Sequence, residues 1–340
     1  MKTVKLITVV FTAVMVIIAG CERKVTETVV VAEQTNCFAC HSDQEFSLVA
    51  ADVQWATSMH ATGGTFERNS SRCSKCHTNE GFNAYIATGS GGSPTNPTPI
   101  GCFTCHAPHT RGDLSLRTSE AVTFERGGTF DRGSANLCAN CHQARTPDPD
   151  ITGATVALEE RWGPHHAGQA SVLTGQGAYT FGMAYTVGAH ANVPNGCISC
   201  HMAPAYGNQA GGHTFKMTYL YHDEETDFVA GCQVEGCHSA TEDFDFSYDG
   251  VQAMVQGLLE DLKAELIAAN LLVLYDGEYA PVEASVSVNE AKAVYNYLLM
   301  EEEGSLGIHN PDYVIDVLNA SIAALGPNAT AADGGPVAAH

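Results

Sequence analysis

The sequence predicts a mostly irregular and helical protein, with a loop-rich domain over residues 37–240 and a C-terminal helical domain of about three helices over residues 241–326. The first observation is a cysteine and histidine motif that recurs six times between residues 37 and 238, among many glycines and prolines and with little helical periodicity. The second is the return of apolar residues at steps of three and four after residue 241. Residues 1–20, 21–36 and 327–340 are predicted to be a signal peptide, a linker and a disordered tail.

The motif Cys-x-x-Cys-His occurs five times in the loop-rich domain, and a sixth copy is stretched to Cys-x-x-x-x-Cys-His. The paired cysteines are Cys37 and Cys40, Cys73 and Cys76, Cys102 and Cys105, Cys138 and Cys141, Cys197 and Cys200, and Cys232 and Cys237. The histidines that follow them are His41, His77, His106, His142, His201 and His238. This motif is the attachment signature of c-type haem, in which two thiols form thioethers and the adjacent imidazole is the proximal iron ligand. We therefore predict six covalently attached haem c groups, which use twelve of the thirteen cysteines.

Two other uses of paired cysteines compete with haem. Structural zinc takes Cys-x-x-Cys pairs without demanding a histidine directly after every second cysteine, and a disulfide framework does not demand one either. The six motifs share 202 residues, about 34 for each haem, which is too few for an ordinary protein core. The haems are therefore expected to be the core of this domain, wrapped by short loops.

The remaining nine histidines decide whether any haem has an open face. An iron with protein ligands on both faces exchanges electrons without binding substrate, whereas an open face allows chemistry. The candidate distal ligands are His60, His109, His165, His166, His190, His213 and His309. His165 and His166 are adjacent, so we expect one of the two to ligate, and His222 is equally well explained as a surface residue. Minor alternatives are Met59, Met183, Met202 and Met217.

The first twenty residues indicate export. Lys2 and Lys5 precede an apolar run from Leu6 to Ile18, which is too short for a comfortable membrane span. The run ends Ile18-Ala19-Gly20-Cys21, which looks like a bacterial lipobox and implies lipidation of Cys21, the cysteine that no haem uses. An ordinary signal peptide with a stray cysteine is the alternative. We expect an exported protein, lipid-anchored at the outer membrane on its periplasmic or cell-surface face.

The chain is strongly acidic. Its formal charge is −22, and it becomes −24 when Lys2 and Lys5 are removed with the signal. This balance excludes nucleic acid as a partner and favours basic redox proteins or oxidised metal species.

An internal repeat lies within the motif region. Residues 63–68 (GGTFER) precede the second motif, and residues 127–132 (GGTFDR) precede the fourth at nearly the same distance. Each copy is expected to be a turn followed by a short strand. The repeat indicates that the haems of the first and second motifs form one duplicated pair and the haems of the third and fourth motifs form another. The longer stretch before the fifth motif then indicates an insertion that supplies His165, His166 and His190.

Three helices are expected at the C-terminal end. The first runs from about Gly250 to Leu274, and the second runs from Asn289 to Glu303. The third begins after an N-cap at Asn310, with proline at the first helical position, and it stops at Gly326.

The sequence resembles the multihaem cytochromes c of the group that holds cytochrome c nitrite reductase, octahaem tetrathionate reductase and hydroxylamine oxidoreductase. The resemblance covers most of residues 37–325 and rests on short elements: residues 197–202 (CISCHM), 212–215 (GHTF) and 307–311 (GIHNP). It implies stacked and perpendicular haem pairs with helices behind them, and a distal role for His213 and for His165 or His166. The chain departs from the group because it has no Cys-x-x-Cys-Lys site for a catalytic haem.

These observations favour an electron carrier over an enzyme: an exported hexahaem cytochrome with a chain of bis-histidine haems that serves redox proteins or extracellular acceptors. One alternative is a reductase of a small nitrogen or sulfur oxyanion at one open haem. A second alternative is a subunit of an extracellular cytochrome filament, with a histidine donated between copies of the chain.

Overall fold

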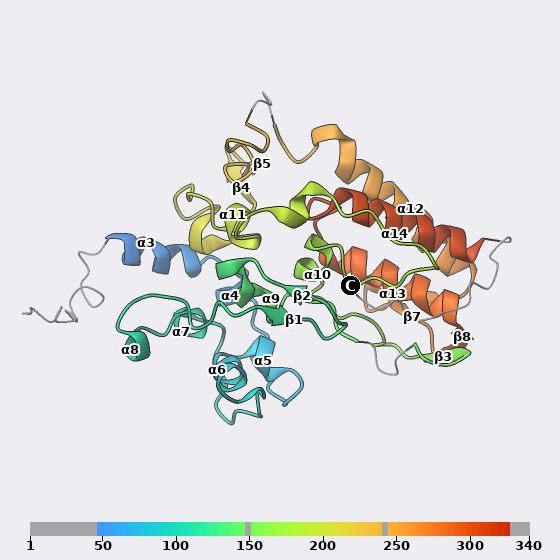
Figure 1. Cartoon of the computed structure of the whole chain (residues 1–340), viewed down its shortest axis with the longest axis horizontal. Coiled ribbons are helices and arrows are strands. Elements are labelled where there is room, and N and C mark those ends of the chain that lie inside the picture. The colour runs from blue at the N-terminus through green and yellow to red at the C-terminus, as the bar shows by residue number, and fades with distance from the viewer. Residues whose placement is uncertain (1–45, 147–150, 240–243, 327–340) are drawn as a thin grey trace, which may run out of the picture. The chain divides into compact units, whose positions relative to one another are not determined.

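A computed structural model describes residues 46–146, 151–239 and 244–326. Cys21, the first motif with Cys37, Cys40 and His41, and the predicted tail 327–340 lie outside the described residues, and the predicted domain boundary falls at the undescribed residues 240–243. No helix in the described ranges is long and apolar enough to cross a membrane. Strands in these ranges form two-stranded sheets, so helices and loops make up most of the fold (Figure 1).

Residues 46–146 consist of short helices joined by loops. The elements are α3 (Phe46–Trp55), α4 (Met59–Thr62), α5 (Ser74–His77), α6 (Asn79–Thr88), α7 (Cys102–Cys105), α8 (Pro108–Arg111), β1 (Val122–Thr123), β2 (Thr129–Phe130), η1 (Gly133–Ala135) and α9 (Asn136–Ala139). The second GGTF copy forms the predicted turn and strand, because Gly127 and Gly128 adopt positive φ angles and let β2 pair with β1. The prediction is wrong for the first copy, where α4 ends at Thr62 and no strand follows.

Residues 151–239 continue in the same style. They hold β3 (Thr155–Leu158), α10 (Gln169–Leu173), η2 (Ala189–Asn192), α11 (Cys197–His201), η3 (Gly212–Thr214) and the hairpin of β4 (Thr218–Tyr221) with β5 (Glu224–Asp227).

The C-terminal segment contains the predicted helices. Its elements are η4 (Tyr248–Gly250), α12 (Val251–Ala268), β6 (Leu272–Tyr275), β7 (Glu278–Pro281), β8 (Ala284–Ser287), α13 (Val288–Glu303) and α14 (Pro311–Leu325). A capping box explains the start of α13: Ser287 Oγ accepts a bond from the Glu290 amide, and the Glu290 carboxylate accepts one from the Ser287 amide. The bounds of α13 and α14 confirm the second and third predicted helices.

The first predicted helix was wrong at its C-terminal end. Helix α12 stops at Ala268, and Asn270 adopts a left-handed conformation with φ 57°. Residues Leu272–Tyr275 then form a hairpin with β7 around Asp276 and Gly277, both at positive φ. An Asp-Gly pair is the usual two-residue turn between antiparallel strands, so this local signal outweighs the apolar stripe that favoured a longer helix.

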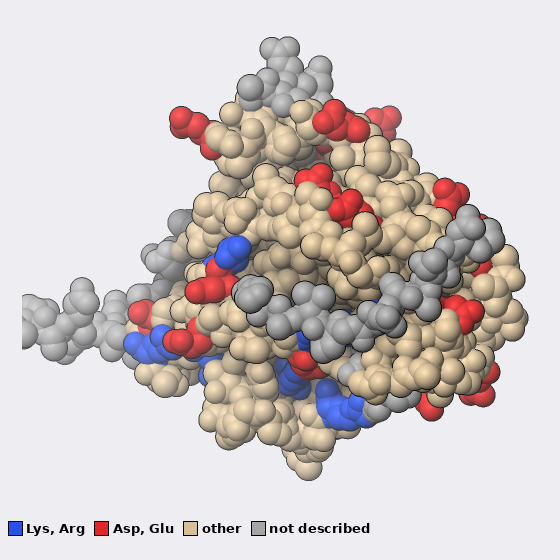
Figure 2. Space-filling model, turned by 45° about the vertical axis from the view of Figure 1, so that its right-hand side comes forward, with Lys and Arg blue, Asp and Glu red and all other residues tan. Residues whose placement is uncertain are grey.

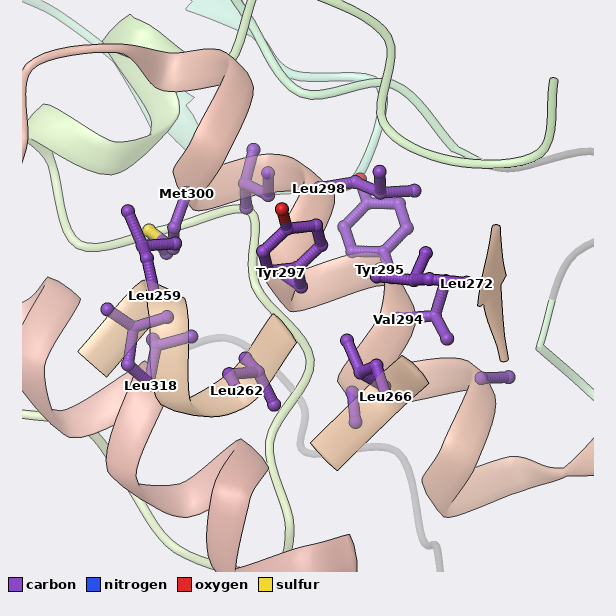
Figure 3. Close-up of a cluster of buried hydrophobic side chains, with 14 of the residues drawn as sticks. Leu259, Leu262, Leu266, Leu272, Val294, Tyr295, Tyr297, Leu298, Met300 and Leu318 are labelled. Carbon is purple, nitrogen blue, oxygen red and sulfur yellow. The ribbon is translucent and has the colours of Figure 1, made fainter. Parts of the chain in front are cut away.

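The main hydrophobic core lies among α12, α13 and α14. Leu262 and Leu266 of α12, Leu299 of α13 and Leu318 of α14 are fully buried there, and Figure 3 shows this cluster. Each fully buried leucine stabilises the fold by about 1.5–3 kcal/mol relative to an exposed one.

The core also includes residues from before the predicted domain boundary. Strand β3 pairs with β8 in antiparallel register, and Val156, Trp162 and Val172 belong to the core cluster. Asn296 of α13 accepts a bond from the Tyr179 amide and donates one to the Tyr179 carbonyl. The insertion before the fifth motif is therefore anchored on the C-terminal helices.

Candidate haem-binding sites

The second to sixth motifs lie on short helical turns or tight loops. In the second, third and fourth motifs, the histidine amide donates to the carbonyl of the first cysteine, as His77 does to Cys73 (3.2 Å). Residues three apart on a helical turn share a face, so the two thiols lie side by side next to the imidazole. This local geometry suits attachment of two cysteines to one porphyrin edge.

The stretched sixth motif keeps the same backbone bond. The His238 amide donates to the Cys232 carbonyl at 3.1 Å, although two more residues separate them than in the short motifs. The extra residues form a turn in which Gly236 has a φ of 86°. The sixth motif therefore presents its histidine to its first cysteine as the short motifs do.

Each of the five described motif histidines faces a second histidine from elsewhere in the chain. The pairs and the distances between their ring centroids are His60 and His142 (6.1 Å), His77 and His165 (6.1 Å), His106 and His213 (6.3 Å), His190 and His238 (6.1 Å), and His201 and His309 (6.1 Å). Every pair joins one predicted proximal ligand to one predicted distal candidate. The partners come from segments distant in sequence, so the tertiary fold brings them together.

The spacing of the pairs fits one metal ion between two imidazoles. An imidazole nitrogen binds a first-row metal at about 2.0–2.1 Å and lies roughly 1.1 Å from its ring centre, so two rings on opposite sides of an iron are about 6.3 Å apart. Aromatic rings in direct contact span about 4.5–7 Å, and three of these pairs are edge-to-face, so the distance is compatible with a shared iron rather than specific for one. What distinguishes the set is that all five described motif histidines have a histidine partner at 6.1–6.3 Å.

Hydrogen bonds to Nδ1 orient many of these imidazoles. The acceptors are backbone carbonyl oxygens of Leu114 for His106 (2.6 Å), of Phe215 for His201 (2.9 Å) and of Ile308 for His190 (2.6 Å). A carbonyl oxygen only accepts, so Nδ1 carries the proton and Nε2 keeps its lone pair for a metal. His142 uses the Gln169 side-chain oxygen (3.1 Å) and His77 the Thr65 hydroxyl (2.9 Å) in the same position.

His309 differs because its Nδ1 contacts a carboxylate. Glu303, at the end of α13, faces it, and the Glu303 side chain is 1% exposed. The Ser305 amide (3.0 Å) and hydroxyl (2.8 Å) also donate to the Glu303 carboxylate. Burial alone would lower the pKa of His309 and raise the pKa of Glu303. The attraction between the two charges outweighs burial, so the pKa of His309 is raised and the pKa of Glu303 is lowered. Among the paired imidazoles of the described residues, His309 is therefore the one that contacts a carboxylate.

Burial keeps several paired histidines neutral. It lowers the pKa of His60 to about 4, and the nearby His142 adds to this shift. Burial also lowers the pKa of His165 to about 3, assisted by the positive charge of Arg145. A neutral imidazole is the form that binds a metal, so these side chains are ready to ligate at neutral pH.

The other histidine candidates have different surroundings. Glu302 accepts a bond from His166 and raises the pKa of that histidine, while the adjacent His165 enters a pair. His109 lies against Phe103, with ring centroids 5.5 Å apart, and His222 contacts Tyr221. His41 and His340 lie outside the described residues. Met59 and Met183 are exposed in this fold.

Thiol contacts show which motifs are neighbours. The thiols of Cys76 and Cys141, of Cys138 and Cys197, and of Cys200 and Cys232 are close enough to interact electrostatically. The second, fourth, fifth and sixth motifs thus form a continuous row. The third motif lies beside the second, where Thr104 of α7 donates to Asn79 of α6 at 2.8 Å. None of the ten described motif cysteines is paired in a disulfide, and the described residues contain no cluster of three or more metal-binding side chains.

Sequence reasoning missed the residues that orient the imidazoles. Gln169 and Glu303 carry no motif that would mark them, whereas Thr65 lies in the first GGTF copy, which the sequence pattern marked only as a turn and strand. The role of all three depends on which loop folds against which histidine. The one local signal was Gly304, which has a φ of 77° and ends α13. It lies between Glu303 and His309, so a turn there can bring the two side chains together.

Comparison with known proteins shows a likeness of fold. No protein-family model matches the sequence, and no curated protein sequence matches it. Among solved structures, the fold is similar to that of the outer cell wall cytochrome OcwA, with a TM-score of 0.50 and 23% sequence identity. The match covers 80% of this chain and 50% of OcwA, so this chain spans about half the length of that protein. The irregular, helix-rich fold thus resembles that of OcwA.

Proposed function

We propose that this chain is an exported electron-transfer protein with six covalently attached haem c groups in bis-histidine sites. The observation that carries the proposal is the set of five opposed imidazole pairs, each with a motif histidine on one side. Haem c supplies one-electron chemistry when it is bound. The chain contributes thiols for attachment, two imidazoles for each iron and the hydrogen bonds that orient them.

The proposal extends to the first motif by elimination. His109 is the distal candidate left when the five pairs, His166 with Glu302, and the surface-like His222 are assigned. We assign His109 to His41. With this assignment every haem iron has two histidine ligands, so no haem has the open face that a reductase needs.

Export and anchoring belong to the same proposal. The apolar run before Cys21 and the name of OcwA, an outer cell wall cytochrome, both favour a protein outside the cytoplasm. Metabolic labelling with a radioactive fatty acid tests the anchor: label is expected in the wild-type chain and is expected to be lost in Cys21→Ser. Equal labelling of both would refute lipidation at Cys21.

Low-temperature EPR of the fully oxidised protein tests the electron-transfer assignment, with haem content measured by the pyridine haemochrome assay. Six low-spin ferric haems for each chain are expected. One high-spin haem in six that shifts on adding nitrite, hydroxylamine or sulfite would overturn the carrier proposal in favour of the reductase. Low-spin content that depends on protein concentration would instead indicate a ligand donated between copies of the chain, as in a filament.

A further inference from the structure

A cationic cavity lies next to the second motif. Its volume is about 380 Å³, and its lining includes Arg72, Lys75, Tyr85, Glu125, Arg145 and Arg161. Lys75 stands between the two cysteines of the motif, Cys73 and Cys76. The lining contains none of the paired histidines and no cysteine, so the cavity lies beside the predicted haem site rather than between its ligands.

The charge of this cavity is opposite to that of the chain. Four of its lining residues are Lys or Arg and one is a carboxylate, whereas the whole chain has 16 Lys and Arg against 38 Asp and Glu. The one lining carboxylate, Glu125, already bonds Lys75 at 2.5 Å. On the face shown in Figure 2, Lys and Arg lie in the lower and left-hand part, and Asp and Glu predominate along the upper and right-hand edges. A local cationic site in an acidic protein attracts small anions that the rest of the surface repels.

The cavity lies close to the second histidine pair. The Arg145 amide donates to the Pro164 carbonyl at 3.1 Å, and Pro164 directly precedes His165. An anion held by Arg145 therefore lies near the site that these two imidazoles form.

We infer that this cavity binds the carboxylate groups of a small anionic electron acceptor, such as a citrate chelate of Fe(III). A guanidinium group offers paired N–H donors that match a carboxylate in two parallel bonds, and several such groups suit a ligand with several carboxylates. The inference rests on the proposed function, because only an electron-transfer protein would reduce the bound chelate. In that event the reduced protein loses one electron and Fe(III) of the chelate becomes Fe(II).

Binding is tested on the oxidised holoprotein by isothermal titration calorimetry with citrate. The test variant is Arg145→Gln with Arg161→Gln, and the control is Arg111→Gln with Lys216→Gln, which removes the same charge from exposed positions outside the cavity lining. We expect the test variant to bind citrate about tenfold or more weakly, and the control to remain within about twofold of wild type. Equal weakening in both variants would mean a general charge effect and would overturn the site. Arg161→Gln alone, at an exposed position, provides a second variant if the double one folds poorly.

Stopped-flow oxidation of the reduced protein tests the second half of the inference. The test variant is expected to react more slowly with Fe(III) citrate but unchanged with cationic hexaammineruthenium(III), which shows that its haems still transfer electrons. Loss of reaction with both oxidants would indicate failure of the proposed function instead. The other source of carboxylates is the haem propionates. In that case wild type would bind no citrate and the test variant would shift one haem potential, which would overturn the inference.

Discussion

The segment from α4 to α9 and the segment from α12 to α14 are held together in different ways. The buried apolar cluster around β1 and β2 contains seven residues, whereas the cluster around the three long helices contains 24. The motif segment instead brings together imidazoles and thiols from distant loops. A region with so few buried apolar side chains cannot offset the entropy of ordering its loops by the hydrophobic effect alone. We therefore expect the helices to be the preformed part of the fold and, under the proposed function, the motif region to depend on bound haem.

Production of the full chain without haem attachment has the largest expected effect. Backbone amides of residues 46–140 are expected to lose nearly all protection from hydrogen exchange, because their stabilising groups are absent, while those of α13 and α14 stay protected by the core. Mass spectrometry of exchanged peptides measures both regions in one sample. Similar protection of the two regions would remove the basis of the comparison.

A cavity in the helical core tests the other side of the comparison. Leu262→Ala is expected to destabilise the C-terminal helices by about 2–5 kcal/mol, because a fully buried side chain leaves a void. Leu274→Ala, at a position 60% exposed, is the control and should change stability little. Chemical denaturation followed by circular dichroism measures both. Equal effects of the two variants would show that the cluster does not stabilise the helices.

Replacement of one distal histidine tests the paired imidazoles. His165→Ala is expected to convert one of the low-spin haems to high spin, since His77 would lose its partner. His166→Ala is a matched control at the adjacent residue, where the imidazole contacts Glu302 instead. EPR of the two oxidised proteins distinguishes them, and the reverse result would assign His166 as the ligand.

The smallest expected effect concerns the carboxylate behind His309. Glu303→Gln should raise the midpoint potential of one haem, because a carboxylate that accepts a bond from Nδ1 makes the imidazole a stronger donor and favours ferric iron. Glu302→Gln is the control, because Glu302 contacts His166 rather than a paired histidine. Spectroelectrochemical titration of the holoprotein measures the shift. An unchanged potential in Glu303→Gln would show that this buried contact is structural.

The sequence by itself determined the features that depend on local spacing. Cys-x-x-Cys-His predicts covalent haem because the two thiols and the imidazole belong to one turn of chain. The bounds of α14 follow from Asn310, Pro311 and Gly326. The end of α12 was missed although Asp276 and Gly277 were visible, since apolar residues continue from Leu271 to Leu274, past the last helical residue Ala268.

Only the tertiary structure decided which histidines meet. Adjacent residues His165 and His166 have the same local sequence context, yet the fold directs the first to His77 and the second to Glu302. The placement of Glu303 beside His309 and of Arg145 near the second motif arises in the same way. Opposed ligands are contributed by loops far apart in the chain, and their approach depends on long-range packing that local spacing does not contain.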